Sequence, residues 1–391
     1  MLVLPSIALW LSIILLVALA GGSLLSLSRH PHWFIRGWDF PRVQIITLGI
    51  ICLATYFTVR LLTDANVFGR SWQWPDTAVV LLGCGLIIWH LVQVINYTPL
   101  GRRQVLQTTS PDDERAIRLV VSNVEFENEN YDLWLAVIGR AEADMVIAVE
   151  VDERWLRAIE SLRAEFPFEI AQPQDNWYGM LVLSKLPLAD IATRFLVEKD
   201  IPSIHMTVEL RSGQRIRISA IHPRPPEPVR GNDSDHRDAE LVVLAREMED
   251  ESLPTIVGGD LNDVAWSSTT RLFLRLSRLL DPRRGRGFFN TFHAKHFWLR
   301  FPLDHVFHSR EFTLRKLERL AFVGSDHFPM LIELQYEPTE KAEQPPMELD
   351  EDHEEQAEEI VEREEDRGNK SLAQDQRAPL PGLRRFPGAI G

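Results

Sequence analysis

The sequence predicts an α+β protein in which two β-sheets pack face to face beneath outer helices, preceded by three membrane-spanning helices. Three observations lead to this prediction. Long apolar runs fall before Arg102, short strands and amphipathic helices then alternate without strict βαβ repetition, and an acidic segment follows Tyr336. We therefore predict a membrane domain at 1–103, a globular domain at 104–336 and a disordered acidic tail at 337–391.

The apolar runs cover residues 3–27, 43–62 and 77–95. A helix needs about 20 apolar residues to cross a hydrocarbon core of roughly 30 Å, so each run is long enough. The first run lacks the basic start of a secretory signal peptide, and two further runs follow it. Buried helices of a soluble protein are the alternative. We expect a multi-pass protein of the cell membrane, and the arginines of the connections favour a cytoplasmic globular domain by one or two charges.

The globular region alternates between strand and helix patterns. Strands are predicted at 117–121, 145–149, 180–184, 204–210, 215–221, 255–257, 302–307 and 329–334. Helices are predicted at 131–143, after Asp152 and after Ser234, each with apolar residues on one face. Strand pairs mixed with helices indicate sheets packed against each other with helices outside.

Charge and cysteine content limit the class of protein. Residues 104–336 carry 28 basic and 37 acidic residues, whereas proteins dedicated to duplex DNA usually have a basic excess. The two cysteines, Cys52 and Cys84, lie in the apolar runs, so neither a disulfide framework nor a thiolate metal site is expected. The segment after Tyr336 has too few apolar residues to offset its ordering entropy, which predicts disorder.

Six short polar islands stand where the predicted strands end. They are 122–124, 149–151, 220–223, 258–262, 303–307 and 324–329. A rigid sheet aims side chains at one point from its strand ends. Carboxylate and amide oxygens suit Mg²⁺ or Mn²⁺, and a metal beside a His–Asp pair positions phosphate and activates water. The islands therefore predict metal-dependent phosphoester hydrolysis.

Taken in this order, the islands resemble the endonuclease/exonuclease/phosphatase superfamily over about residues 117–334. The resemblance rests on an Asn, a Glu, a His, a Gly-Asp-Leu-Asn run ending at Asn262, an Asp, and a Ser-Asp-His-Phe-Pro run starting at Ser325. One such motif alone is weak evidence for the superfamily, but all six in this order are strong evidence. The resemblance implies a four-layer α/β/β/α sandwich and a divalent-metal-dependent hydrolase.

The resemblance also assigns residues to the metal and to the substrate. Asn123, Glu150 and Asp326 match the metal side of the family site, with Glu150 as the principal ligand of Mg²⁺ or Mn²⁺. Tyr178 matches a substrate-side tyrosine segment of relatives, and Arg224 is a further phosphate-binding candidate.

The remaining matches are catalytic. Asp260 would align or deprotonate the attacking water, and Asn262 would hold a phosphate oxygen. His222 would donate to the phosphate or the leaving group, and Asp304 would orient His327. Both Asp260 and His327 remain candidates for the general base.

Three hypotheses about the function remain open: two differ in the substrate, and the third is a protein without catalytic activity. Residues 271–300 carry eight basic residues and several aromatic ones, which is typical of a grip on nucleic acid and equally of contact with lipid headgroups. The three apolar runs favour a lipid-linked or membrane-proximal phosphoester, and a nuclease is the alternative. The further alternative is a non-catalytic docking protein that recruits partners through its acidic tail. We predict no particular protein partner.

Overall fold

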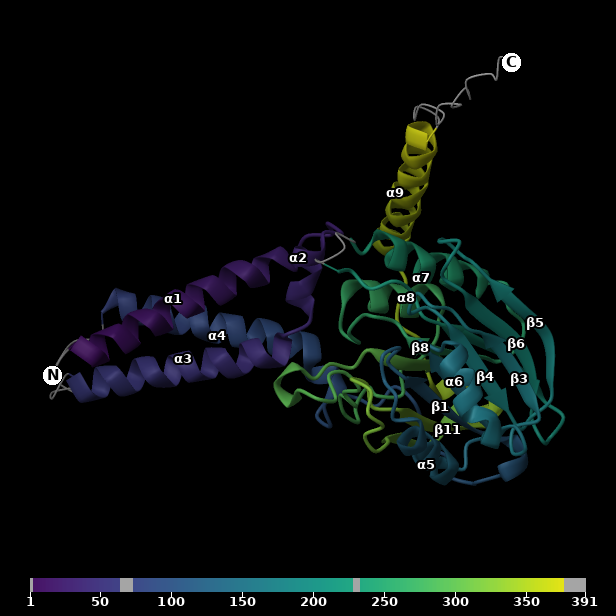
Figure 1. The fold of residues 1–391 in the computed structure, drawn as a ribbon. Coiled ribbons are helices and arrows are strands. Elements are labelled where there is room, and N and C mark those ends of the chain that lie inside the picture. Colours follow the sequence, from purple (N-terminus) through teal and green to yellow (C-terminus); the bar gives the residue numbers. More distant parts are fainter. Residues whose placement is uncertain (1–2, 64–72, 228–232, 376–391) are drawn as a thin grey trace, which may run out of the picture.

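An N-terminal helical bundle stands beside a globular domain, and a long C-terminal helix projects from that domain (Figure 1). The structure is a computed structural model that describes residues 3–63, 73–227 and 233–375.

The bundle consists of α1 (Val3–Leu25), α3 (Arg42–Thr63) and α4 (Trp74–Val94). Each helix is long and apolar enough to cross a membrane, which confirms the three predicted apolar helices. The three helices contact one another. The connection from α1 to α3 carries α2 (Trp33–Arg36) and η1 (Gly37–Asp39).

The globular domain contains two sheets. The first has the order β10-β11-β1-β2-β4-β3, and the second has the order β5-β6-β7-β8-β9. The strands of the first are β1 (Ala116–Asn123), β2 (Met145–Val149), β3 (Phe168–Gln172), β4 (Met180–Ser184), β10 (Phe312–Arg319) and β11 (Met330–Tyr336). Those of the second are β5 (Leu188–Arg194), β6 (Ser203–Glu209), β7 (Arg215–Ile221), β8 (Thr255–Asp260) and β9 (Asp304–His308).

Each sheet has one parallel pair at its centre, β1 with β2 and β7 with β8. All other pairs are antiparallel. Carboxyl ends of parallel neighbours meet at one edge, so each sheet presents two strand ends side by side. Every predicted strand is observed, while β3, β5 and β10 had no clear signal because they alternate irregularly at the sheet edges.

The two sheets pack face to face through a buried apolar layer. Leu119 and Ile147 of the first sheet meet Ile218 and Ile256 of the second, and all four side chains are fully buried. Burying a large aliphatic side chain contributes about 1.5–3 kcal/mol, so this layer is a main source of stability.

Helices cover both outer faces. They are α5 (Tyr131–Ala141), α6 (Glu153–Ala158) and η4 (Ile159–Leu162) on the first sheet, and α7 (Asp235–Glu247) and α8 (Ser268–Leu276) on the second. The arrangement is the predicted α/β/β/α sandwich.

The segment after Tyr336 differs from the predicted disordered tail. It contains η6 (Pro338–Glu343) and α9 (Glu351–Asp375), which packs on α7 and α8. Ala357 and Ile360, one turn apart, are buried in the cluster that lies under α7. A narrow apolar stripe therefore orders a helix whose average composition is strongly polar. The last sixteen residues of the predicted tail lie outside the described residues.

Candidate active site

The ends of the two parallel strand pairs meet at one edge of the sandwich. Asn123 ends β1, Glu150 follows β2, and Asp260 ends β8. The Asn123 Nδ2 group donates to Glu150 Oε1 at 2.7 Å and to Asp260 Oδ2 at 3.0 Å. One buried amide thus connects the carboxylates of both sheets, and the strand-end residues converge as expected.

Glu150, the residue after β2, has its backbone in the left-handed region, with φ at 66°. Its Oε2 atom accepts from the Phe126 backbone N–H at 2.9 Å. Burial raises the pKa of Glu150 to about 7, although hydrogen bonds from Asn123 and Phe126 oppose that shift. Ionising a buried carboxyl group costs free energy, and a cation bound beside it would stabilise the ionised form.

Asp260 ends β8 where the backbone at Gly259 runs close to β7. Gly259 has φ at 156°, and a Cβ atom there would lie 1.8 Å from the carbonyl oxygen of Ile221. The Asn262 backbone N–H then donates to Asp260 Oδ1 at 2.9 Å. Burial would raise the pKa of Asp260, but the adjacent His327 and other neighbours outweigh it and hold the pKa below its ordinary value. Asp260 is therefore an ionised acceptor.

His327 and Asp304 form a buried pair. His327 Nδ1 lies 2.7 Å from Asp304 Oδ2, and His327 Nε2 lies 3.6 Å from Asp260 Oδ2. Burial alone would lower the pKa of His327, but the carboxylates of Asp304 and Asp260 raise it to about 10. The imidazole is consequently a cation and a hydrogen-bond donor at neutral pH.

His222, the residue that follows β7, lies close to Asp260. Its Nε2 atom lies 3.9 Å from Asp260 Oδ2, and burial lowers the pKa of His222 to about 4. The Tyr178 ring lies 5.5 Å from the His222 ring, so Tyr178 forms part of the site wall. Arg224 stacks behind it, with its Nε bonded to Glu198 at 2.7 Å. Arg224 is thus placed to support Tyr178, and its guanidinium is already paired.

Asp326 completes the acidic side of the site and is partly exposed. Its negative charge raises the pKa of both Glu150 and His327, which reflects its nearness to them. Asn262 has a different neighbour, because its Nδ2 group donates to the Pro223 carbonyl at 3.0 Å. All eight residues expected for catalysis and metal binding therefore gather at this edge.

Two contacts at the site escaped the sequence reasoning. Glu125 accepts from the Asp326 backbone N–H at 3.1 Å and from Lys295 Nζ at 2.5 Å. The ring of Phe292 lies 5.0 Å from that of His327. Lys295 and Phe292 belong to the basic and aromatic segment already noted, but no local pattern pairs them with Glu125.

Two sets of ligand atoms are candidates for a metal. Asp260, Asp304 and His327 bring one ligand atom each to within 4.8 Å of one another. However, a protonated His327 has no lone pair to offer a metal. The second candidate is the Glu150 carboxylate with the nearby Asp326 carboxylate, since oxygen ligands are those that Mg²⁺ or Mn²⁺ prefers; Asn123 approaches Glu150 through its amide N–H, and its Oδ1 accepts from the Glu125 N–H. This second set fits a divalent cation better.

Comparison with known proteins agrees with this arrangement. The profile of the Endonuclease/Exonuclease/phosphatase family matches residues 120–327, which contain all eight of the residues expected for catalysis and metal binding. No curated protein matches the chain.

Several solved structures are similar in fold. A humanized D. rerio TDP2 with 14 mutations has 12% identity and a TM-score of 0.47, covering 56% of this chain and 99% of its own. The human Nocturnin catalytic domain with bound sulfate anion has 16% identity and a TM-score of 0.47, covering 59% and 96%. An endonuclease/exonuclease/phosphatase from Beutenbergia cavernae has 17% identity and a TM-score of 0.45, covering 57% and 72%.

Proposed function

Because the chain belongs to the Endonuclease/Exonuclease/phosphatase family, we propose that it is a divalent-metal-dependent phosphoester hydrolase anchored in a membrane. In this proposal residues 1–103 form the membrane domain and residues 104–336 the catalytic domain. The observation that carries it is the meeting of Glu150, Asp260 and His327 at one edge, joined by Asn123.

The metal side and the water side of the site are distinct. Glu150, with Asn123 and Asp326 beside it, would hold Mg²⁺ or Mn²⁺, which when bound would supply positive charge for the phosphate and for the attacking water. Asp260 accepts a hydrogen bond from that water, orients it toward phosphorus and takes its proton. Family resemblance gives Asn262 the role of holding a phosphate oxygen.

The two histidines have opposite protonation states in this mechanism. The pKa of His327, raised to about 10, keeps its Nε2–H available to donate to a phosphate oxygen. The pKa of His222, lowered to about 4, keeps that ring neutral at pH 7, so it donates one N–H to the phosphate or the leaving group without adding charge. These states favour Asp260 over His327 as the general base.

An exposed apolar tip supports a substrate in or near the membrane. Phe297, Trp298 and Leu299 of η5 are 62%, 68% and 52% exposed. Gln44 of α3 donates to the Trp298 carbonyl at 2.9 Å, so the tip lies beside the start of an apolar helix. The same segment reaches the site, since the Ala294 N–H donates to the Asp326 carbonyl. We propose a lipid or lipid-linked phosphoester as substrate.

The nuclease alternative loses its main support. The basic residues of 271–300 are largely engaged inside the protein: Arg271 donates to Gln93, Arg283 pairs with Asp281, and Arg286 donates to the Val105 carbonyl. Side chains used in this way do not form an open basic track for a nucleic-acid backbone.

The test is phosphate or phosphoester release by the detergent-purified full chain. The panel contains bis-p-nitrophenyl phosphate, phospholipid micelles, polyprenyl pyrophosphate and plasmid DNA, each with Mg²⁺, Mn²⁺ or chelator, and each with His327→Ala as control. We expect chelator-sensitive turnover, best on a lipid substrate and lost in the variant. Turnover of DNA that falls steeply with salt would favour the nuclease instead. Turnover that survives in His327→Ala would overturn the site.

A further inference from the structure

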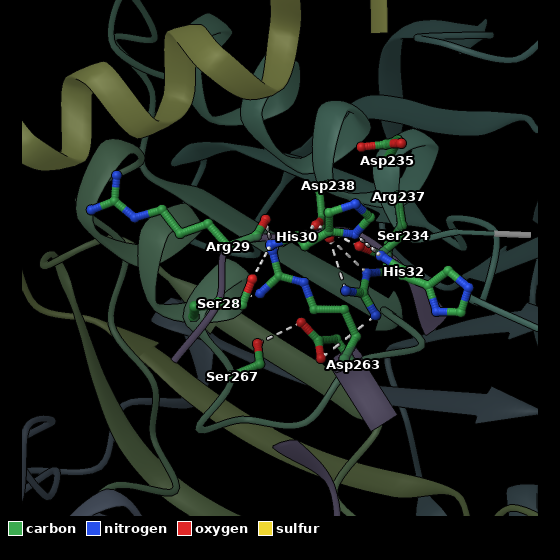
Figure 2. Close-up of polar contacts among 12 residues, drawn as sticks. Ser28, Arg29, His30, His32, Ser234, Asp235, Arg237, Asp238, Asp263 and Ser267 are labelled. Carbon is green, nitrogen blue, oxygen red and sulfur yellow. Dashed lines mark hydrogen bonds and ion pairs between the residues drawn. The ribbon is translucent and has the colours of Figure 1, made fainter. Parts of the chain in front are cut away.

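The segment that follows the Gly-Asp-Leu-Asn run is held by a buried arginine. Arg237 of α7 is 1% exposed, and its Nη1 donates to the Asn262 carbonyl at 2.9 Å. The same guanidinium donates to Asp238 Oδ1 at 2.8 Å and faces Asp263 Oδ1 at 3.6 Å. Figure 2 shows Arg237 between these two carboxylates, with Ser267 bonded to Asp263.

A second buried arginine reaches this cluster from the connection between the first two apolar helices. Arg36 of α2 is 4% exposed and lies 3.7 Å from Asp238 Oδ2. Its Nη1 donates to Ser268 Oγ at 2.8 Å, at the start of α8. Arg36 therefore touches both helices that flank the Asn262 segment.

Two further hydrogen bonds tie the same segment to the bundle. Trp266 Nε1 donates to the Asp39 carbonyl at 2.7 Å, and the Tyr97 hydroxyl donates to the Ala265 carbonyl at 2.6 Å. Asp39 lies in the α1–α3 connection, and Tyr97 lies just after α4. The segment from Asn262 to Ser268 is thus fastened to the bundle at three places.

The backbone of Asn262 needs this support. Its φ is 52°, in the left-handed region, and its N–H must still reach Asp260 Oδ1. Asn tolerates this region better than most residues, but the conformation persists only when neighbours hold it. Arg237 does so from one side, and buried carboxylates at Asp238 and Asp263 keep its charge compensated.

We infer that the membrane-side connection is part of the active-site scaffold: Arg36, acting through Asp238 and Arg237, is a positioning residue for Asn262 and hence for Asp260. The inference rests on the proposed hydrolysis. The bundle then acts as more than an anchor, because the catalytic geometry depends on its contact with the globular domain.

The test is a double-mutant cycle in the detergent-purified full chain. With bis-p-nitrophenyl phosphate as substrate, we expect Arg36→Ala to lower kcat by roughly 10- to 100-fold with little change in KM, because small misplacements of reacting groups are costly. Arg36→Lys, which keeps the charge opposite Asp238, should recover part of that loss. In the Asn262→Ala background, Arg36→Ala should lower kcat by no more than about threefold.

The matched control is Arg194→Ala, which removes the ion pair to Glu247 at the other end of α7 and should leave kcat within about twofold. Losses from Arg36→Ala that are equal in both backgrounds would reduce Arg36 to a purely structural residue and overturn the inference. If Arg36→Ala does not fold, Tyr97→Phe removes only the hydroxyl that holds Ala265, and the same non-additivity with Asn262→Ala is expected.

Amide hydrogen exchange gives a readout that needs no turnover. Peptides covering residues 261–271 should exchange faster in Arg36→Ala than in wild type or Arg194→Ala. Unchanged exchange there would overturn the positioning role. If wild type hydrolyses none of the substrates but exchange still rises in Arg36→Ala, the proposed function fails. The structural link between the α1–α3 connection and the Asn262 segment would then still hold.

Discussion

His327 and Asp304 are locked together at the centre of the site, with His327 Nδ1 2.7 Å from Asp304 Oδ2 and both side chains buried. Asp304 is itself fixed, because its backbone N–H donates to Thr291 Oγ1 at 3.1 Å. The pair directs the other ring nitrogen of His327 toward Asp260. A cation held in this way donates to developing negative charge without having to reorient.

Asp304→Asn should remove the charge that keeps His327 protonated. Since carboxylates raise the pKa of His327 to about 10, losing one should lower it and make the ring neutral over more of the pH range. We expect kcat to fall by roughly 10²- to 10⁴-fold and the alkaline limb of the pH–kcat/KM profile to move to lower pH. Steady-state kinetics across pH would measure both. An unshifted limb would contradict the assigned role of the pair.

Glu150→Gln should weaken metal binding while leaving the fold intact. The substitution keeps the shape and the hydrogen bond to the Phe126 N–H but removes the negative charge that would hold a divalent cation in the proposed site. We expect weaker Mg²⁺ binding by calorimetry and a loss of activity of roughly 10²-fold or more. Glu153→Gln, at the exposed start of α6, is the matched control and should bind Mg²⁺ as wild type does. Equal binding by both variants would remove Glu150 from the metal site.

Much of the site was predictable because its chemistry stands at strand ends. Asn123, Glu150 and Asp260 each interrupt or follow an apolar strand, where a polar residue has no packing role. The parallel pairing of the strands brings such residues together. Their positions at strand ends and the family resemblance predicted this convergence, whereas the pairing itself was not predicted.

The remaining contacts depend on long-range packing that no local pattern encodes. Lys295 meets Glu125 across 170 positions, and Arg36 bonds Ser268 across 232. Charged and hydroxyl side chains are too common in a sequence for such pairs to be picked out. The docking of α9 was missed for a related reason, since Ala357 and Ile360 are sparse apolar residues among many acidic ones.

Gly259→Ala should damage the fold and the site together. The new Cβ would lie 1.8 Å from the Ile221 carbonyl oxygen, and the backbone φ of 156° is itself unfavourable for alanine. Strain of this kind costs about 1–3 kcal/mol even before the clash is relieved, so the free energy of unfolding should fall by at least that amount. Denaturant unfolding measures it. Gly213→Ala, where φ is also positive but nothing lies within 4 Å, separates the strain from the clash and should cost less.

The contact between α7 and α9 should depend on pH through His236. Its Nδ1 lies 2.8 Å from Glu364 Oε1, and this hydrogen bond, with the nearby Glu198, raises the pKa of His236 above its ordinary value despite burial and Arg367. Protonation therefore favours the folded state. The resulting stability is fully present below the unfolded pKa, near 6.5, and is lost as pH rises through the higher folded pKa.

His236→Asn should accordingly lower the Tm of the full chain at about pH 6 but make little difference at about pH 9. Thermal unfolding of both proteins across this range, at constant ionic strength, measures the gap between them. Glu364→Gln removes the partner charge from α9. The difference in Tm between wild type and this variant should likewise decrease as the pH rises from about 6 to about 9. A gap that stays constant with pH would mean that His236 packs against α9 without its charge contributing.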